Sequence, residues 1–201
     1  MKKDTNIEVR HYNNSTISIR STENKESRTV EGYAVIFDTL SEDLGFTEVI
    51  KKEAITEDTI KRSDIFFLLN HNENRGILAR SKKGKGTLKL EIDDKGLRYE
   101  FEAPATELGN ELLEMLQRGD IDSSSFAFTV TGDGDVWEET PEGKYLRTVI
   151  KIDRLYDCSA VYQPAYEATT CENKRFIEFQ EQQQKEVKLQ KYFTELEKQI
   201  R

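Results

Sequence analysis

Alternating apolar and polar residues mark several short segments of the chain, a pattern typical of β-strands with one buried face. The clearest pair covers residues 88–92 and 97–101, and the polar run 93–96 between them ends in glycine. This arrangement predicts a β-hairpin. We expect further strands at 16–20 on a sheet edge, 30–37, 65–69, 126–130, 145–152 and 155–162.

Two segments between these strands have the apolar spacing of short helices. The first is 53–61. In the second, 108–116, the apolar residues share one face, Thr106 is placed to cap the N-terminus and Gly119 to end the helix. Six or more strands with two short helices predict an α+β domain, a β-rich and closed or nearly closed barrel with peripheral helices.

Composition divides the chain into three parts. Residues 1–28 are polar and predict the edge strand followed by a loop, 29–177 hold the folded domain, and 178–201 form a tail rich in Glu, Gln and Lys. Apolar residues recur in the tail at helical spacing. They are Leu189, Phe193, Leu196 and Ile200. The predicted helix either packs on its own domain, or pairs with a partner such as a second copy, or forms part of a removable tail.

The charge balance narrows the classes of partner. The 201 residues include 38 acidic and 30 basic ones, and a net charge of −8 argues against a general nucleic-acid binder. The longest apolar run is 65–69, whereas a helix that spans a bilayer needs about 20 residues. The first residues lead into no apolar segment of a secretory signal. We therefore expect no membrane contact and a place in the cytoplasm, where Cys158 and Cys171 stay reduced.

Three polar residues on or beside predicted strands are candidates for catalysis. His71 follows an apolar strand almost directly, and Ser125 lies on the strand face opposite Phe126, with small Ala127 leaving an open face in front of it. Asp157 is an acid in an apolar strand, where a buried charge needs a partner. Serine, histidine and aspartate together form the triad of serine hydrolases.

Each candidate also has an ordinary explanation. His71 is then an incidental histidine at a strand end, serines 123–125 mark a turn, and Asp157 pairs with Arg154 or with a backbone group. His11, the other histidine of the chain, lies in a polar N-terminal stretch that we expect to be mobile. On the pattern alone these explanations stay open.

Metal and nucleotide sites find little support in the sequence. His71 and the two cysteines lack the spacing of a zinc motif. Residues 132–135 lack the remaining acids of a calcium loop and 83–86 lack the Walker pattern, so both predict turns. Cys158 is a poor nucleophile candidate because alternation places it opposite Asp157. We expect no metal and no cofactor.

Several segments in a fixed order resemble a known protein family. They are 31–37 (EGYAVIF), 41–48 with LGF at its centre, 68–71 (LLNH), Gly96-Leu97, 119–128 ending in SFAF, and 157–166 (DCSAVYQPAY). From about residue 28 to 170 the chain resembles the caudoviral prohead serine proteases, the capsid maturation proteases of tailed bacteriophages. That family is related in fold to the herpesvirus assembly protease, which implies a β-barrel surrounded by helices.

The resemblance implies a serine endopeptidase and assigns a role to each candidate. His71 matches the histidine of the family's Asn-His pair, Ser125 the serine of its Ser-Phe-x-Phe motif, and Asp157 the acid before its Val-Ser segment. The implied catalytic residues are therefore His71, Ser125 and Asp157, with no cofactor.

The sequence departs from the family pattern at three places, none of which is a proposed catalytic residue. Asn72 replaces a usual Asp, Ala127 a common Gly, and 51–53 stands where Pro-Gly is frequent. The family implies that the substrates are the scaffold, or the scaffold-like region of the major capsid protein, and the protease itself, inside the assembling prohead in the host cytoplasm. The alternative is a non-catalytic scaffold or interaction module that keeps the protease fold.

Overall fold

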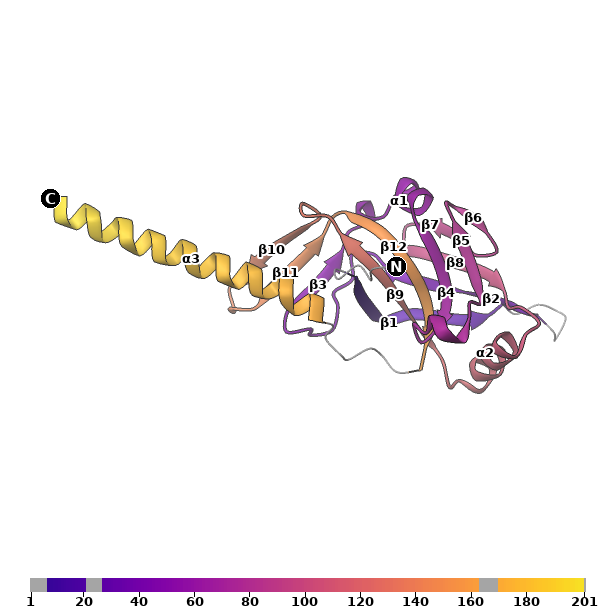
Figure 1. Cartoon of the computed structure of the whole chain (residues 1–201). Helices are drawn as coiled ribbons and strands as arrows, with labels where there is room; N and C mark the ends of the chain where they lie inside the picture. Colours follow the sequence, from indigo (N-terminus) through magenta and orange to yellow (C-terminus); the bar gives the residue numbers. More distant parts are fainter. Residues whose placement is uncertain (1–6, 21–26, 163–169, 201) are drawn as a thin grey trace. The chain divides into compact units, whose positions relative to one another are not determined.

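A computed structural model describes residues 7–20, 27–162 and 170–200 of the chain (Figure 1). The chain divides into two units, Met1–Tyr166 and Glu167–Arg201. The second contains one helix, α3 (Thr170–Ile200), which confirms a C-terminal helix and starts it eight residues before the predicted 178. None of the described helices is long and apolar enough to span a membrane.

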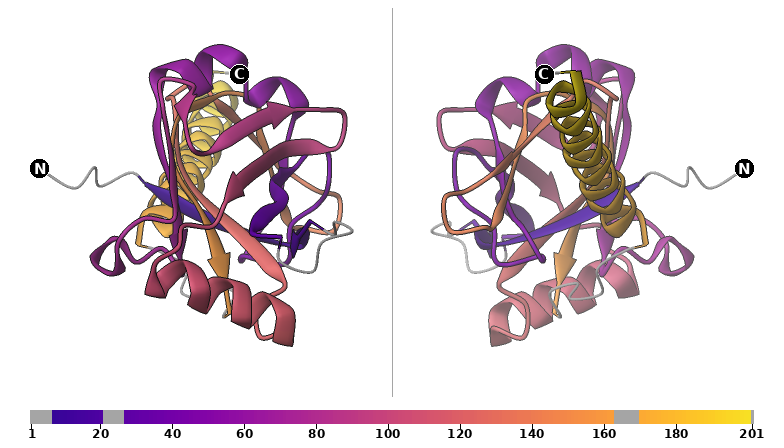
Figure 2. Two further views of the ribbon diagram at one scale, coloured as in Figure 1. Left: turned by 90° about the vertical axis from the view of Figure 1, so that its right-hand side faces the viewer. Right: turned by 90° about the vertical axis from the view of Figure 1, so that its left-hand side faces the viewer.

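The first unit is built on a nine-stranded sheet. Its strands are β1 (Glu8–Ile19), β2 (Thr29–Ile36), β4 (Asp64–Leu69), β5 (Ala79–Lys82), β6 (Lys85–Gly86), β7 (Lys89–Ile92), β8 (Gly96–Glu102), β9 (Ser123–Val130) and β12 (Ile152–Val161). They are hydrogen-bonded in the order β6-β5-β4-β12-β9-β1-β2-β8-β7. Because the chain passes from β6 to β7 across two residues, the two edge strands of the sheet lie close together. The sheet is therefore a nearly closed barrel, as predicted (Figures 1 and 2).

A second sheet of three strands accompanies the barrel. It consists of β3 (Thr47–Ile50), β10 (Asp135–Glu139) and β11 (Tyr145–Val149), in the order β10-β11-β3. β11 pairs antiparallel with β10 and parallel with β3. The turn at 132–135 leads from β9 into β10, and the turn at 83–84 joins β5 to β6, where the sequence predicts turns.

The helices of the first unit are short and lie outside the barrel. They are η1 (Lys52–Ala54), α1 (Glu57–Arg62), η2 (Glu73–Arg75) and α2 (Glu107–Arg118). Figure 2 shows α1 and α2 at opposite ends of the barrel. α2 has the predicted caps, because the Thr106 hydroxyl accepts a hydrogen bond from the Gly109 N–H and Gly119 adopts the left-handed conformation. The helix predicted at 53–61 is divided into η1 and α1, and Thr56 caps the second.

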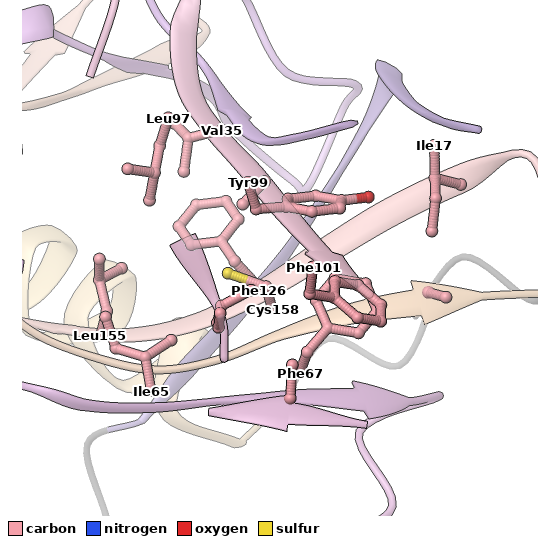
Figure 3. Close-up of a cluster of buried hydrophobic side chains, with 14 of the residues drawn as sticks. Ile17, Val35, Ile65, Phe67, Leu97, Tyr99, Phe101, Phe126, Leu155 and Cys158 are labelled. Atoms are coloured by element: carbon pink, nitrogen blue, oxygen red, sulfur yellow. The ribbon is translucent and has the colours of Figure 1, made fainter. Parts of the chain in front are cut away.

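The barrel interior is filled by aromatic and aliphatic side chains from several strands (Figure 3). Phe67 of β4 contacts both Tyr99 and Phe101 of β8, with ring centroids 4.9 and 4.4 Å apart. On β9, Phe126 stacks on Phe128 at 4.9 Å. The core joins strands that are distant in sequence and so fixes the positions of β4, β8 and β9.

The structure corrects two of the strand predictions. The segment 16–20 is not an edge strand, because it is the second half of β1, which begins at Glu8 and lies between β9 and β2. The strand predicted at 145–152 ends at Val149, and Ile152 already begins β12. A polar sequence therefore occupies an interior position of the sheet, held by backbone pairing on both sides.

Candidate active site

Three neighbouring strands bring the predicted catalytic residues together. β12 pairs in parallel with β4 and antiparallel with β9, so it lies between them (Figure 1). Asp157 lies on β12, Ser125 on β9 opposite Ser159 of β12, and His71 two residues beyond the end of β4. Each side chain is thus held by its own strand at a fixed register.

The three side chains form a continuous chain of short contacts. His71 Nε2 lies 2.6 Å from Ser125 Oγ, and His71 Nδ1 lies 2.6 Å from Asp157 Oδ1. A neutral imidazole donates through one nitrogen and accepts through the other, and the carboxylate requires the proton on Nδ1. Nε2 is then free to accept the proton of the Ser125 hydroxyl, which is the arrangement of a Ser-His-Asp triad.

The backbone at His71 is strained in a way that turns its ring toward β12. Asn70 and His71 both have positive φ, 55° and 54°, which is uncommon for residues with a side chain. Hydrogen bonds hold both residues, since the Asn70 N–H donates to the Ala160 carbonyl at 2.8 Å and the His71 N–H to Ser159 Oγ at 3.2 Å. Strained residues of this kind persist where the surroundings fix them and are common at active sites.

Burial separates the three residues. Asp157 is 8% exposed, and the His71 side chain keeps 19% of its surface in contact with solvent. Ser125 is 0% exposed, so the open face predicted in front of it is not there. Strand β1 covers it, with His11 opposite Ser125 in register and the Ser125 hydroxyl 2.9 Å from the Arg10 carbonyl oxygen.

The opposite face of β9 points into the core, as alternation predicts. Ser124 Oγ is hydrogen-bonded to the buried Tyr99 hydroxyl at 2.6 Å, and burial raises the pKa of Tyr99. Cys158 also lies on this face, where burial first and the nearby Asp157 charge second raise its pKa. A thiol that stays protonated inside the core is a poor nucleophile, so the thiol alternative is rejected.

The alternative explanations for the other candidates also fail. Arg154 is exposed, whereas Asp157 faces His71. His11 does not lie in an irregular stretch, because it belongs to β1 and its Nδ1 lies 3.1 Å from the Ser124 carbonyl oxygen. Within the described ranges, no group of three or more His, Cys, Asp and Glu residues is placed to hold a metal ion.

The sequence reasoning missed two residues that touch the triad. Ser159 lies two residues beyond Asp157 on the same strand, so the two-residue period of a strand is a signal that could have found it. Arg10 has no such signal, because its contact with Ser125 depends on a pairing between strands more than 100 residues apart.

The family model of the caudovirus prohead serine proteases matches residues 15–185 of the chain. The chain belongs to this family. The predicted resemblance is thereby confirmed, and the match includes all three triad positions. The segment Glu8–His11 that covers Ser125 lies before the matched range.

Two further comparisons complete the findings. No curated protein matches the chain. Among solved structures, the chain is similar to the capsid assembly protease gp21 of bacteriophage T4, with 12% identity and a TM-score of 0.48. The similarity covers 79% of this chain and 98% of that one.

Proposed function

We propose that this prohead protease is a serine endopeptidase in which Ser125 is the nucleophile, His71 the general base and Asp157 the residue that orients His71. The observation that carries the proposal is the pair of 2.6 Å contacts that His71 makes through its two ring nitrogens. An incidental histidine has no need of a serine on one side and a carboxylate on the other.

The geometry supports the usual two-step hydrolysis. Ser125 Oγ attacks the peptide carbonyl carbon while its proton passes to His71 Nε2, and the resulting imidazolium is stabilised by Asp157. His71 then gives this proton to the leaving amine, so that the peptide C–N bond breaks and an acyl-Ser125 ester remains. A water molecule activated by His71 releases the acyl group as a carboxylic acid and restores the enzyme.

Family membership supports a role in capsid maturation. We propose that the substrates are the scaffold, or the scaffold-like region of the major capsid protein, and the protease itself. The proposed place of action is the interior of the assembling prohead in the host cytoplasm.

One observation favours a second candidate function. Ser125 is 0% exposed, which is what a module that kept the barrel but lost turnover would tolerate. A non-catalytic scaffold or interaction module, however, has no need of a strained His71 backbone or of a complete triad. We therefore place the protease first and use catalysis itself to separate the two functions.

The test is co-expression of the protein with the major capsid protein encoded beside it, followed by intact-mass analysis of both. We expect the wild type to shorten the capsid protein at defined bonds and Ser125→Ala to leave it intact. Ser123→Ala is the matched control, because Ser123 belongs to the same strand and bonds to Asp122 outside the triad. Unchanged masses with the wild type, although shells form, would favour the non-catalytic module.

A further inference from the structure

We propose that Ser159 is a positioning residue of this site, which holds the Asp157 carboxylate and the main chain of His71 at the same time. The proposal rests on the proposed protease function and adds a fourth side chain to it. Ser159 is 0% exposed and faces the triad from the centre of β12.

The hydrogen-bonding capacity of the Ser159 hydroxyl is used completely by the triad. A serine hydroxyl donates one hydrogen bond and accepts two. Ser159 Oγ donates to Asp157 Oδ1 at 2.7 Å and accepts the His71 backbone N–H at 3.2 Å. It also lies 3.2 Å from His71 Nδ1, whose proton it shares with Asp157.

These contacts give Ser159 two effects on His71. The hydroxyl fixes one end of the strained His71 backbone, which would otherwise relax from its positive φ. It also donates to the carboxylate that faces the imidazole, and so offsets part of its charge. Without this donor, Asp157 attracts a proton on His71 more strongly.

The test compares Ser159→Ala with Ser63→Ala. Ser63 is an equally suitable buried serine, because its hydroxyl also makes two hydrogen bonds, to the Thr59 carbonyl and from the Leu155 N–H, away from the triad. Removal of a hydrogen bond to a charged group is expected to lower kcat about ten- to hundredfold in Ser159→Ala, with KM unchanged. The acid limb of the pH profile should move to higher pH.

A measurement that needs no turnover separates this proposal from the protease function. The chain has two histidines, so NMR spectra of ¹⁵N-histidine in the wild type and in a His11→Gln variant assign the His71 ring. In Ser159→Ala the His71 resonances should titrate at higher pH than in the wild type and in Ser63→Ala. An unchanged titration would overturn the role of Ser159 even if proteolysis is confirmed.

A different contact carries a second inference: the segment Glu8–His11 masks the nucleophile. The Ser125 hydroxyl has one proton, and two acceptors lie within reach, His71 Nε2 at 2.6 Å and the Arg10 carbonyl oxygen at 2.9 Å. Donation to Arg10 removes the proton from the path to His71. The same strand leaves Ser125 with no exposed surface, so a substrate carbonyl has no approach.

Buried ion pairs anchor this segment to the three-stranded sheet. Arg10 lies 2.8 Å from Glu48 of β3, and Glu8 is 2.9 Å from Arg147 of β11. All four side chains are almost completely buried. Burial works to lower the pKa of Arg147, but the charges of Glu48 and Glu8 outweigh it and raise that pKa, so the guanidinium stays charged. The anchor is strong because a broken pair leaves a buried charge alone.

The segment is nevertheless separable from the rest of β1. The pairing with β9 shifts register between His11 and Thr16, and the half of β1 beyond this irregularity pairs with β2. If residues 1–11 are removed, Arg147 keeps Glu48 at 2.8 Å and Asp135 at 2.7 Å as partners. The barrel is therefore expected to fold without Glu8–His11.

The test measures how fast a fluorophosphonate modifies Ser125, a reaction in which Oγ bonds to phosphorus and fluoride leaves. Intact mass follows the adduct in the full chain, in residues 7–201 and in residues 12–201, with Ser125→Ala as the blank. We expect the first two to react slowly and 12–201 at least tenfold faster. Equal rates for all three would overturn the mask, whereas no Ser125 adduct in any of them would contradict the protease function.

A disulfide provides a second route that does not depend on the truncated chain. Val9 and Ala127 are opposite each other in the β1–β9 pair, so Val9→Cys with Ala127→Cys can lock the segment in place. The oxidised protein should resist the fluorophosphonate, and reduction should restore the reaction. Equal rates before and after reduction would contradict masking.

Discussion

At the residue scale, the imidazole of His71 connects two strands that are not adjacent in the chain. Its ring reaches Ser125 on β9 and Asp157 on β12, although His71 itself follows β4. The positive φ of Asn70 and His71 makes this reach possible, and the cost of that conformation is offset by hydrogen bonds to β12. A strained residue held in this way indicates a site built for chemistry.

The role of Asp157 can be tested without changing the shape of the side chain. Asp157→Asn should lower kcat by about 10³- to 10⁴-fold, because an amide no longer fixes the Nδ1 proton of His71 or stabilises its cation. The measurement is the rate of capsid-protein cleavage. Asp153→Asn, on the same strand, is the control and should keep the wild-type rate. A modest loss in Asp157→Asn, below tenfold, would remove Asp157 from the triad.

The positions of the triad residues follow from the sequence, but their surroundings do not. Strand alternation separates Ser125 from Ser124 and Asp157 from Cys158, and the structure confirms both separations. The cover over Ser125 could not be predicted, because the residues before Thr16 are polar and carry no strand pattern. Their order comes from backbone pairing with β9 and from buried ion pairs, both of which are contacts between distant segments.

At the element scale, β2 and β8 support the strand that carries the nucleophile. Gly32 of β2 lies against the Tyr99 side chain, and the Tyr99 hydroxyl bonds to Ser124 next to Ser125. A Cβ atom at Gly32 would lie 2.3 Å from the Thr16 carbonyl oxygen and closer than a normal contact to the Tyr99 hydroxyl. The glycine is therefore required by close packing between strands.

This packing predicts the effect of a single methyl group. Gly32→Ala should lower the free energy of unfolding by about 1–3 kcal/mol, because backbone and a buried ring must move to make room. Gly132→Ala is the matched control, since nothing lies within 4 Å of its added Cβ, and its effect should stay within about 0.5 kcal/mol. Urea denaturation of both variants provides the comparison. Equal stability of the two would contradict the close approach of β2 to β8 and β1.

Elements with local signals were predicted well and elements with distant partners were not. The hairpin β7–β8 and the capped helix α2 are fixed by residues close in sequence, and both lie where expected. The strands β3 and β10 of the small sheet were missed. The alternation of β3 is interrupted by Glu48, a buried charge whose partners come from β1 and β11.

At the scale of the whole molecule, the buried core belongs to the first unit alone. In the described part of the chain, the clustered core residues extend from Ile17 to Ala160. On α3, Leu189 and Phe193 of the predicted apolar stripe are exposed, and the side chains of Leu196 and Ile200 lie outside the described residues. The choice between a helix that packs on its domain and one that pairs with a partner remains a prediction from sequence.

A truncated chain tests whether α3 contributes to folding. We expect residues 1–166 to keep a Tm within about 2 °C of the full chain, because no described core residue is removed. A fall of more than about 5 °C would show that α3 packs on the domain. Co-expression of the same truncated chain with capsid protein tests the proposed recruiting role of the tail, which predicts fewer copies of the protease in each prohead.

The most direct test of the central claim, that His71 and Ser125 act as one catalytic unit, is a double-mutant comparison of capsid-protein cleavage. Ser125→Ala, His71→Gln and the double variant should all fall to the same residual rate, because either loss alone disables the unit. Losses that multiply in the double variant, or a single variant that keeps the wild-type rate, would contradict the account.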